Sequence, residues 1–207
     1  MKNASRKSPA GRKLMLRRCV ADGQCNARTP TLRTRTNGKS NSIWPWLRQK
    51  TKGLILVYLG IDPGITGAWA ALDTHGDFVA CGDIPTMDGR VVDSALKESI
   101  LATINPVDGA CIVIEQVHAM PGQGVTSMFN FGHSCGVVAA VADMLPYPVS
   151  FVTPQRWKKH HGLIGTKKAD SLKKARVMWP DAPLKLAKHH GRSEALLIAA
   201  YWFGVMR

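Results

Sequence analysis

The chain has 207 residues and a formal net charge of +14. This length allows one domain with an extension, or one larger domain. The five cysteines form no C-x-x-C pair and no regular spacing, which argues against a disulfide framework or a zinc site and indicates a reduced, intracellular protein. No stretch reaches the ~18 apolar residues of a membrane span, so no membrane partner is expected.

The charge is segregated along the chain. Residues 1–52 carry a net charge of +13, residues 53–155 carry −8 and residues 156–207 carry +9. Such segregation favours a polyanion that approaches particular sides of the molecule. For the first segment alone, a solvated basic tail that aids solubility is the alternative.

Residues 1–53 are predicted to form a basic, disordered N-terminal arm, and residues 54–207 a folded domain. The arm has few large apolar residues before Ile43, so it cannot bury enough surface to offset the entropy of ordering. It is Arg-rich and acid-poor, as organellar transit peptides are, but it lacks the apolar core of a secretory signal. We expect a cytoplasmic location in a bacterium or for a phage-encoded protein. Organellar targeting by the arm and a mis-assigned start codon stay open.

The domain begins with a predicted strand, turn and strand over residues 54–73, with Pro63-Gly64 in the turn. A third strand follows over 78–84, which makes an antiparallel meander. Apolar residues then recur at helical spacing and predict a helix over 91–105.

The second half of the domain alternates strands and helices. We expect a buried strand over 110–117, a helix of small residues over about 125–145, and a strand over 148–154. A basic helix over 167–179 and an apolar helix over 193–204 complete the chain. The pattern predicts an α/β fold with a five-stranded mixed sheet, namely an antiparallel three-strand meander plus two parallel strands, flanked by helices.

Three acids lie in or beside apolar elements: Asp62, Glu115 and Glu194. A buried carboxylate must be protonated, paired with a cation or bound to a metal ion. Adjacent parallel strands would bring Asp62 and Glu115 together, and a helix across them would add Glu194, with His190 one turn earlier. Clustered oxygen ligands suit Mg²⁺ or Mn²⁺.

Each of these residues also has a simpler interpretation. Asp62 fits a turn before Pro-Gly, and Glu115 fits the exposed end of a strand. Glu194 fits the first turn of a helix, where the dipole favours an acid, and His190 fits a surface or capping position. The three acids together, in this order on these elements, favour a metal centre.

Several segments resemble RuvC-type Holliday junction resolvases, most closely the phage and prophage-like branch. They are "LGIDPGITGAW", "CIVIEQV", "GRSEALLIAAYW" and the stretch from "VTPQRWKKHHGLIG" to "KKADSLKKARVMWP". The resemblance covers about residues 55–205. It implies an RNase H-like fold, a homodimer and no nucleotide cofactor. It also implies a crossover junction endodeoxyribonuclease that hydrolyses DNA at four-way junctions in recombination and repair.

By this resemblance, Asp62, Glu115 and Glu194 are catalytic metal ligands for two Mg²⁺ or Mn²⁺ ions per subunit. The family often has a His or Asp three residues before its last acid. Here that position is Gly191, and His190 is the nearest candidate for the catalytic role. The last acid is Glu rather than the more usual Asp, so both departures bear on the second metal site.

Two groups of residues are candidates for DNA contact. The lysine candidates are Lys158, Lys159, Lys167 and Lys168, and the candidates for contact at the junction centre are Met120, Phe129 and Phe131. Lys158 and Lys168 are expected nearest the site. The alternative for the lysines is a solvated helix face, and the alternative for the phenylalanines is packing in the core or in a dimer interface.

Three other functions fit parts of the sequence. An actin-like or sugar-kinase-like ATPase also has an acid-glycine turn after its first strand, but it needs a second such domain and a longer chain. A non-catalytic nucleic-acid binder of the same fold is compatible with Gly191. A nuclease of the same superfamily that processes structured RNA is the third alternative.

Overall fold

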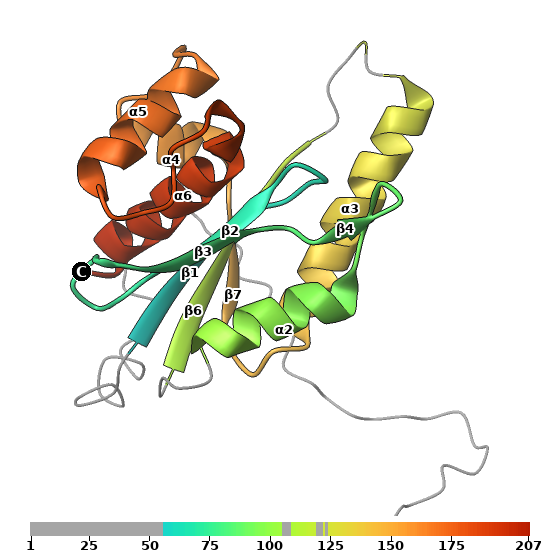
Figure 1. Ribbon diagram of the computed structural model, residues 1–207, viewed down its shortest axis with the longest axis horizontal. Helices are drawn as coiled ribbons and strands as arrows, with labels where there is room; N and C mark the ends of the chain where they lie inside the picture. Colours follow the sequence, from blue (N-terminus) through green and yellow to red (C-terminus); the bar gives the residue numbers. More distant parts are fainter. Residues whose placement is uncertain (1–55, 105–108, 119–121, 123) are drawn as a thin grey trace, which may run out of the picture. The chain divides into compact units, whose positions relative to one another are not determined.

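The computed structural model describes residues 56–104, 109–118, 122 and 124–207 (Figure 1). The predicted arm, its boundary at residue 53 and Met120 therefore lie outside the described residues. A five-stranded sheet with the order β3-β2-β1-β6-β7 forms the centre of the domain. Its strands are β1 (Leu56–Asp62), β2 (Ala68–Leu72), β3 (Phe78–Asp83), β6 (Gly109–Glu115) and β7 (Val149–Val152).

The directions of the strands confirm the predicted mixed sheet. Strands β1, β2 and β3 pair antiparallel, whereas β6 runs parallel to β1 and β7 runs parallel to β6. This combination of a three-strand meander with two parallel strands is the sheet that was predicted for an RNase H-like fold.

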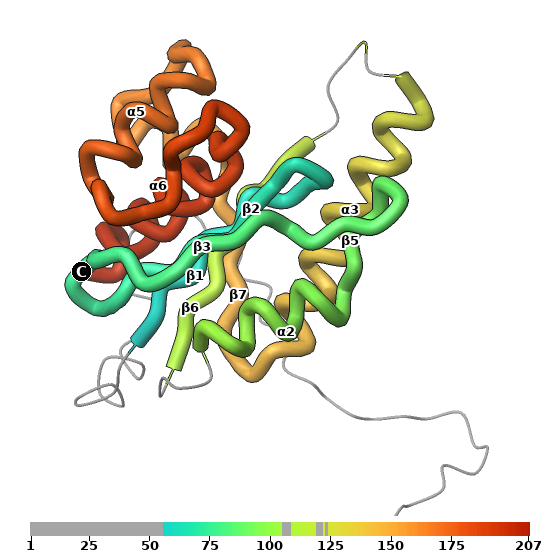
Figure 2. Tube along the Cα trace, viewed as in Figure 1, coloured from blue at the N-terminus to red at the C-terminus, as the bar shows by residue number. Residues whose placement is uncertain are grey.

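Helices cover both faces of this sheet, as Figures 1 and 2 show. Along β1, Val57, Leu59 and Ile61 belong to the core under α2 and α3, because successive side chains of a strand point to opposite faces. Tyr58 belongs to the other face, where α6 packs on β1 and β2. The helices are α2 (Asp93–Ile104), α3 (Val125–Asp143), α4 (Pro154–His160), α5 (Lys168–Met178), the 3₁₀ turn η1 (Ala187–His189) and α6 (His190–Met206).

Three features of the structure differ most from the sequence prediction. A small hairpin of β4 (Thr86–Met87) and β5 (Arg90–Val91) was not predicted, although Asp88-Gly89 between them has the positive φ angles typical of a tight hairpin turn. The strand predicted to reach residue 154 ends at Val152, and α4 follows at once with Pro154 in its first turn, a position that suits proline. Helix α6 begins at His190, three residues before the predicted start.

Helix α3 is 19 residues long and, by length and composition alone, is the helix in the described part of the chain that qualifies as a membrane span. The sequence expectation concerned an unbroken apolar stretch of about 18 residues, and α3 does not contradict it because Asn130 and His133 interrupt its apolar residues. Its Val138 and Val141 are buried in the core shared with α2.

Candidate metal centre and nucleic-acid interface

Asp62 and Glu115 end two neighbouring parallel strands in the same register. Ile61 of β1 pairs with Ile114 of β6, so the acids that follow them lie side by side at one edge of the sheet. Ile61 and Ile114 both point into the core under α2 and α3, which directs both acids to the opposite face, under α6. Glu115 is buried, and Asp62 is partly buried.

Glu194 comes from α6, which lies close against β1. Gly60 makes this approach possible, because a Cβ atom there would collide with the backbone oxygen of Ala195. Glu194 itself is only 8% exposed although it lies in the second turn of its helix. The alternative interpretation of Glu194 as a first-turn acid is therefore not what the structure shows.

The three carboxylates are close enough to act on one another. Burial raises the pKa of Asp62 well above its ordinary value, and the negative charges of Glu115 and Glu194 raise it further. Burial also raises the pKa of Glu115, and the charge of Glu194 adds to this increase. A hydrogen bond from Trp157 acts in the opposite direction and lowers the pKa of Glu115. The three acids thus act on one another electrostatically.

Their chemistry fits a hard divalent cation, because oxygen ligands with mutual repulsion are stabilised by positive charge. Within the described residues, however, no three His, Cys, Asp or Glu side chains lie close enough together to hold a metal ion as they stand. One oxygen of Glu115 is already engaged by Trp157 at 2.8 Å. Binding of an ion would therefore require the side chains of Asp62 and Glu194 to turn toward the carboxylate of Glu115.

The structure explains why residue 191 is a glycine. A Cβ atom at this position would be 2.7 Å from the backbone oxygen of Thr66, in the turn between β1 and β2. The first turn of α6 therefore lies too close to this turn for a larger residue. His190 is partly buried, and its backbone oxygen accepts a hydrogen bond from Ser193. It is not among the main charges that shift the pKa of Asp62 or Glu115, so its catalytic role stays a prediction.

Two of the four candidate lysines lie near the acids. The positive charges of Lys168 and Lys158 lower the pKa of Asp62, and the same two lysines lower the pKa of Glu115. Lys159 is exposed on α4. Lys167 precedes α5, where its backbone N–H donates to Asp170 at 2.9 Å.

The first half of α3 also borders the acidic edge. Phe131 lies against Gly64 in the turn after Asp62. Burial raises the pKa of the Cys135 thiol to about 11, and Asp62 is the first charge that adds to the increase. Phe129 is 73% exposed, which leaves its ring free for contact with a ligand.

Sequence reasoning missed two residues around the site. Trp157 donates its indole N–H to Glu115, and Arg192 binds Asp83 at the end of β3. The only sequence signal for Trp157 was a tryptophan among the basic residues of "QRWKKHH". Nothing in the sequence pairs Arg192 with an acid 109 residues away.

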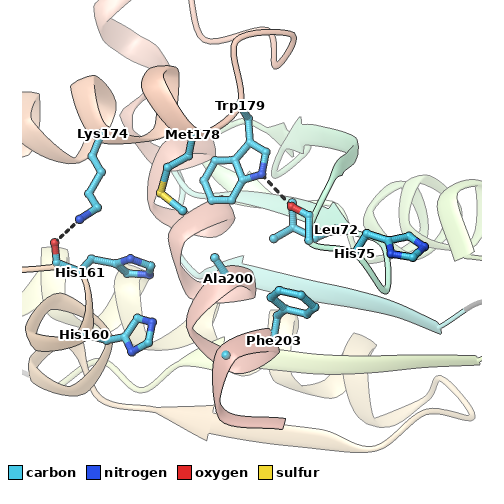
Figure 3. Close-up of a pocket in the computed structure, with 11 residues that line it drawn as sticks. Leu72, His75, His160, His161, Lys174, Met178, Trp179, Ala200 and Phe203 are labelled. Carbon is cyan, nitrogen blue, oxygen red and sulfur yellow. Dashed lines mark hydrogen bonds between the residues drawn. The ribbon is translucent and has the colours of Figure 1, made fainter. Parts of the chain in front are cut away.

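A cavity of about 590 Å³ lies at the other end of α6 (Figure 3). Phe203 and Trp179 line it, together with His160 and Lys174. It adjoins the turn that follows β2, whereas the acids lie at the start of β2, so the cavity and the acidic edge are separate.

No family model matches the chain. One curated protein, the chloroplastic Holliday junction resolvase MOC1 of Chlamydomonas reinhardtii, is 35% identical over 94 residues, which are 44% of this chain and 11% of that protein. The chain therefore matches only about a tenth of the length of this relative.

Two solved structures align with 70% of the chain. RuvC of T. thermophilus in complex with Holliday junction substrate has a TM-score of 0.49 and 16% identity, over 70% of this chain and 94% of that chain. A second Thermus thermophilus RuvC structure has a TM-score of 0.47 and 18% identity over the same shares of the two chains.

Proposed function

We propose that this protein is a divalent-metal-dependent endonuclease that cuts branched DNA, with the four-way junction as its substrate. The observation that carries the proposal is that Asp62, Glu115 and Glu194 act on one another at one edge of the sheet, where burial and the charges of the two glutamates raise the pKa of Asp62. The name of the curated relative, a Holliday junction resolvase, supports the choice of substrate.

The residues of this chain would divide the work as follows. Asp62, Glu115 and Glu194 would hold two divalent ions, and such ions supply an activated water and stabilise the leaving oxygen in phosphodiester hydrolysis. Lys158 and Lys168, whose charges reach the acids, would bind the phosphates on either side of the scissile bond. The exposed Phe129 would contact unstacked bases.

We also propose that the protein acts as a homodimer through α3. The part of α3 that carries Val125, Gly132 and Gly136 is exposed, and Cβ atoms at both glycines would meet nothing within 4 Å. Val125 is 87% exposed, which is unusual for a branched apolar side chain on a helix. Two such faces could pack closely against each other around a twofold axis, which would provide two cuts for one junction.

We propose two alternative locations for the protein. One is the predicted cytoplasm of a bacterium or of a phage-infected cell. The other is an organelle reached through residues 1–53, which the chloroplastic name of the curated relative supports. Neither location changes the chemistry proposed for the folded domain.

A cleavage assay tests the function. Purified protein with Mg²⁺ is incubated with a labelled four-way junction, a matched duplex and a structured RNA. Paired nicks in the junction are expected from the wild type, and none from Asp62→Asn, whose junction affinity should stay within a few fold of the wild type. Cleavage of the RNA alone would assign a ribonuclease instead. Tight binding without cutting by either protein would assign a non-catalytic binder.

A further inference from the structure

Trp157 lies in α4, directly under the acidic edge. Its side chain is completely buried, and its Nε1–H donates a 2.8 Å hydrogen bond to Oε1 of Glu115. The two residues are 42 positions apart in the chain, so this bond joins the end of β6 to a helix on the α6 face of the sheet.

The bond constrains the carboxylate of Glu115. An indole has only one donor and no acceptor, so a buried indole N–H that faces a carboxylate oxygen has a fixed partner and a fixed direction. Oε1 is held in this bond, and Oε2 is the oxygen left for another ligand. The donor also offsets part of the cost of keeping Glu115 ionised in a buried place beside Glu194.

The ring of Trp157 has a second contact. The ammonium of Lys158 lies 5.1 Å from its centroid, within the range of a cation–π interaction. Lys158 is also one of the two cations that act on Asp62 and Glu115. One buried side chain therefore touches a candidate metal ligand through its edge and a candidate phosphate contact through its face.

We infer that Trp157 is a positioning residue that fixes the carboxylate of Glu115 for a divalent ion and holds Lys158 beside the same site for a DNA phosphate. This inference rests on the proposed function, because it assigns Glu115 and Lys158 the roles given there. It predicts that substitutions can separate the effect of the hydrogen bond at the edge of the indole from the effect of the lysine contact at its face.

Two substitutions separate them. Trp157→Phe keeps an aromatic ring under Lys158 but removes the donor to Glu115, whereas Trp157→Leu removes both contacts. The matched control is Trp179→Phe. Trp179 is also buried on the α6 face and donates its Nε1–H at 3.0 Å, but to the backbone oxygen of Gly76 at the distant cavity (Figure 3).

Two measurements are made on each full-length protein. Mn²⁺ is titrated calorimetrically without DNA, and the affinity for a four-way junction is measured in EDTA at several salt concentrations. Trp157→Phe should weaken Mn²⁺ binding about 10-fold, as loss of an outer hydrogen bond to a metal ligand typically does, and leave junction affinity unchanged. Trp157→Leu should weaken both and make the log–log salt slope shallower by up to about 0.9. Trp179→Phe should change neither.

The outcomes separate this inference from the proposed function. If Trp157→Phe binds Mn²⁺ as tightly as the wild type, the inference is wrong, while cleavage of the junction by the wild type leaves the function standing. If Trp157→Phe weakens Mn²⁺ binding but the wild type cuts no nucleic acid, the inference holds and the function fails. If the wild type binds no Mn²⁺, both fail. An unchanged salt slope in Trp157→Leu overturns the part that concerns Lys158.

A measurement on the wild type covers the case in which Trp157→Phe does not fold. The indole N–H resonances are assigned through bonds, and Mg²⁺ is added in steps. The resonance of Trp157 should shift and that of Trp179 should stay in place. A stationary Trp157 resonance, with other resonances of the acidic edge shifting, overturns the inference.

Discussion

Arg192 binds both carboxylate oxygens of Asp83, with Nε 2.6 Å from Oδ1 and Nη2 2.8 Å from Oδ2. Asp83 ends β3, and Arg192 lies two residues before Glu194 in α6. The pair therefore ties the start of α6 to the same edge of the sheet at which the three acids meet. Its contribution to stability should depend on pH, because the hydrogen bond from Arg192 lowers the pKa of Asp83.

A lowered pKa in the folded state means that the pair stabilises the protein above the unfolded pKa of Asp, about 3.9, and that this stabilisation is lost as the pH falls through the lower folded value. Asp83 is 58% exposed, so solvent screening limits the effect. Arg192→Lys, which cannot bind both oxygens in the same way, should lower the free energy of unfolding by up to about 1 kcal/mol at pH 7.

Urea unfolding of Arg192→Lys and the wild type from pH 7 to pH 2.5 checks this prediction, and the difference should shrink toward zero at the acidic end. The control is Arg176→Lys. Arg176 donates to the backbone oxygens of Leu184 and Lys185, which do not titrate, so its effect should stay constant. A difference for Arg192→Lys that is equally constant would contradict the role assigned to Asp83.

Asp62→Asn should stabilise the metal-free protein at neutral pH. Burial and the charges of Glu115 and Glu194 raise the pKa of Asp62, so ionised Asp62 costs free energy in the folded state. A neutral amide of the same shape removes that cost. Thermal unfolding in EDTA at pH 7.5 should show a higher Tm for Asp62→Asn than for the wild type, by several degrees. Adding Mg²⁺ should raise the Tm of the wild type more than that of the variant. Equal melting curves in EDTA would show that Asp62 is not under repulsion.

The two lysines near the acids should contribute equally to DNA affinity. Lys158→Gln and Lys168→Gln are each expected to weaken junction binding and to reduce the slope of log affinity against log salt by about 0.9, the value for one phosphate contact. Lys97→Gln is the control, because α2 lies on the other face of the sheet. Fluorescence anisotropy at four salt concentrations measures the slopes. A slope that changes as much in Lys97→Gln would indicate only a general effect of net charge.

The exposed face of α3 should form the dimer. Gly136→Arg would place a long charged side chain on that face, and we expect it to convert the dimer into a monomer with the fold intact. Sedimentation velocity measures the mass, and Glu98→Arg on α2 serves as a charge control. A wild-type protein that sediments as a monomer at tens of micromolar would remove the basis for this interface.

The sequence predicted the sheet well because its signals are local. Alternation and tight turns indicated the meander, and the single acids in apolar runs indicated Asp62 and Glu115. Since parallel strands of a sheet align their ends, the meeting of these two acids could also be predicted. A helix across the strands was expected to add Glu194, but the close approach of α6 to Gly60 leaves no local pattern in the sequence.

Contacts between distant segments account for what was missed. The partners Trp157–Glu115 and Arg192–Asp83 are 42 and 109 residues apart, and neither pairing leaves a local pattern. Gly191 was interpreted only as a missing ligand. In the structure, the backbone oxygen of Thr66 occupies the space that a side chain there would need.

Helix α6 is fixed at its start by the contact of Gly191 with Thr66 and farther along by the contact of Gly60 with Ala195. A helix seated this closely on the turn and on β1 has little room to slide or rotate to suit the radius of an ion. Any adjustment must come from the side chain of Glu194, which has one more rotatable bond than an aspartate. In the proposed metal centre, a long ligand on such a support would let one site accept both the smaller magnesium and the larger manganese ion.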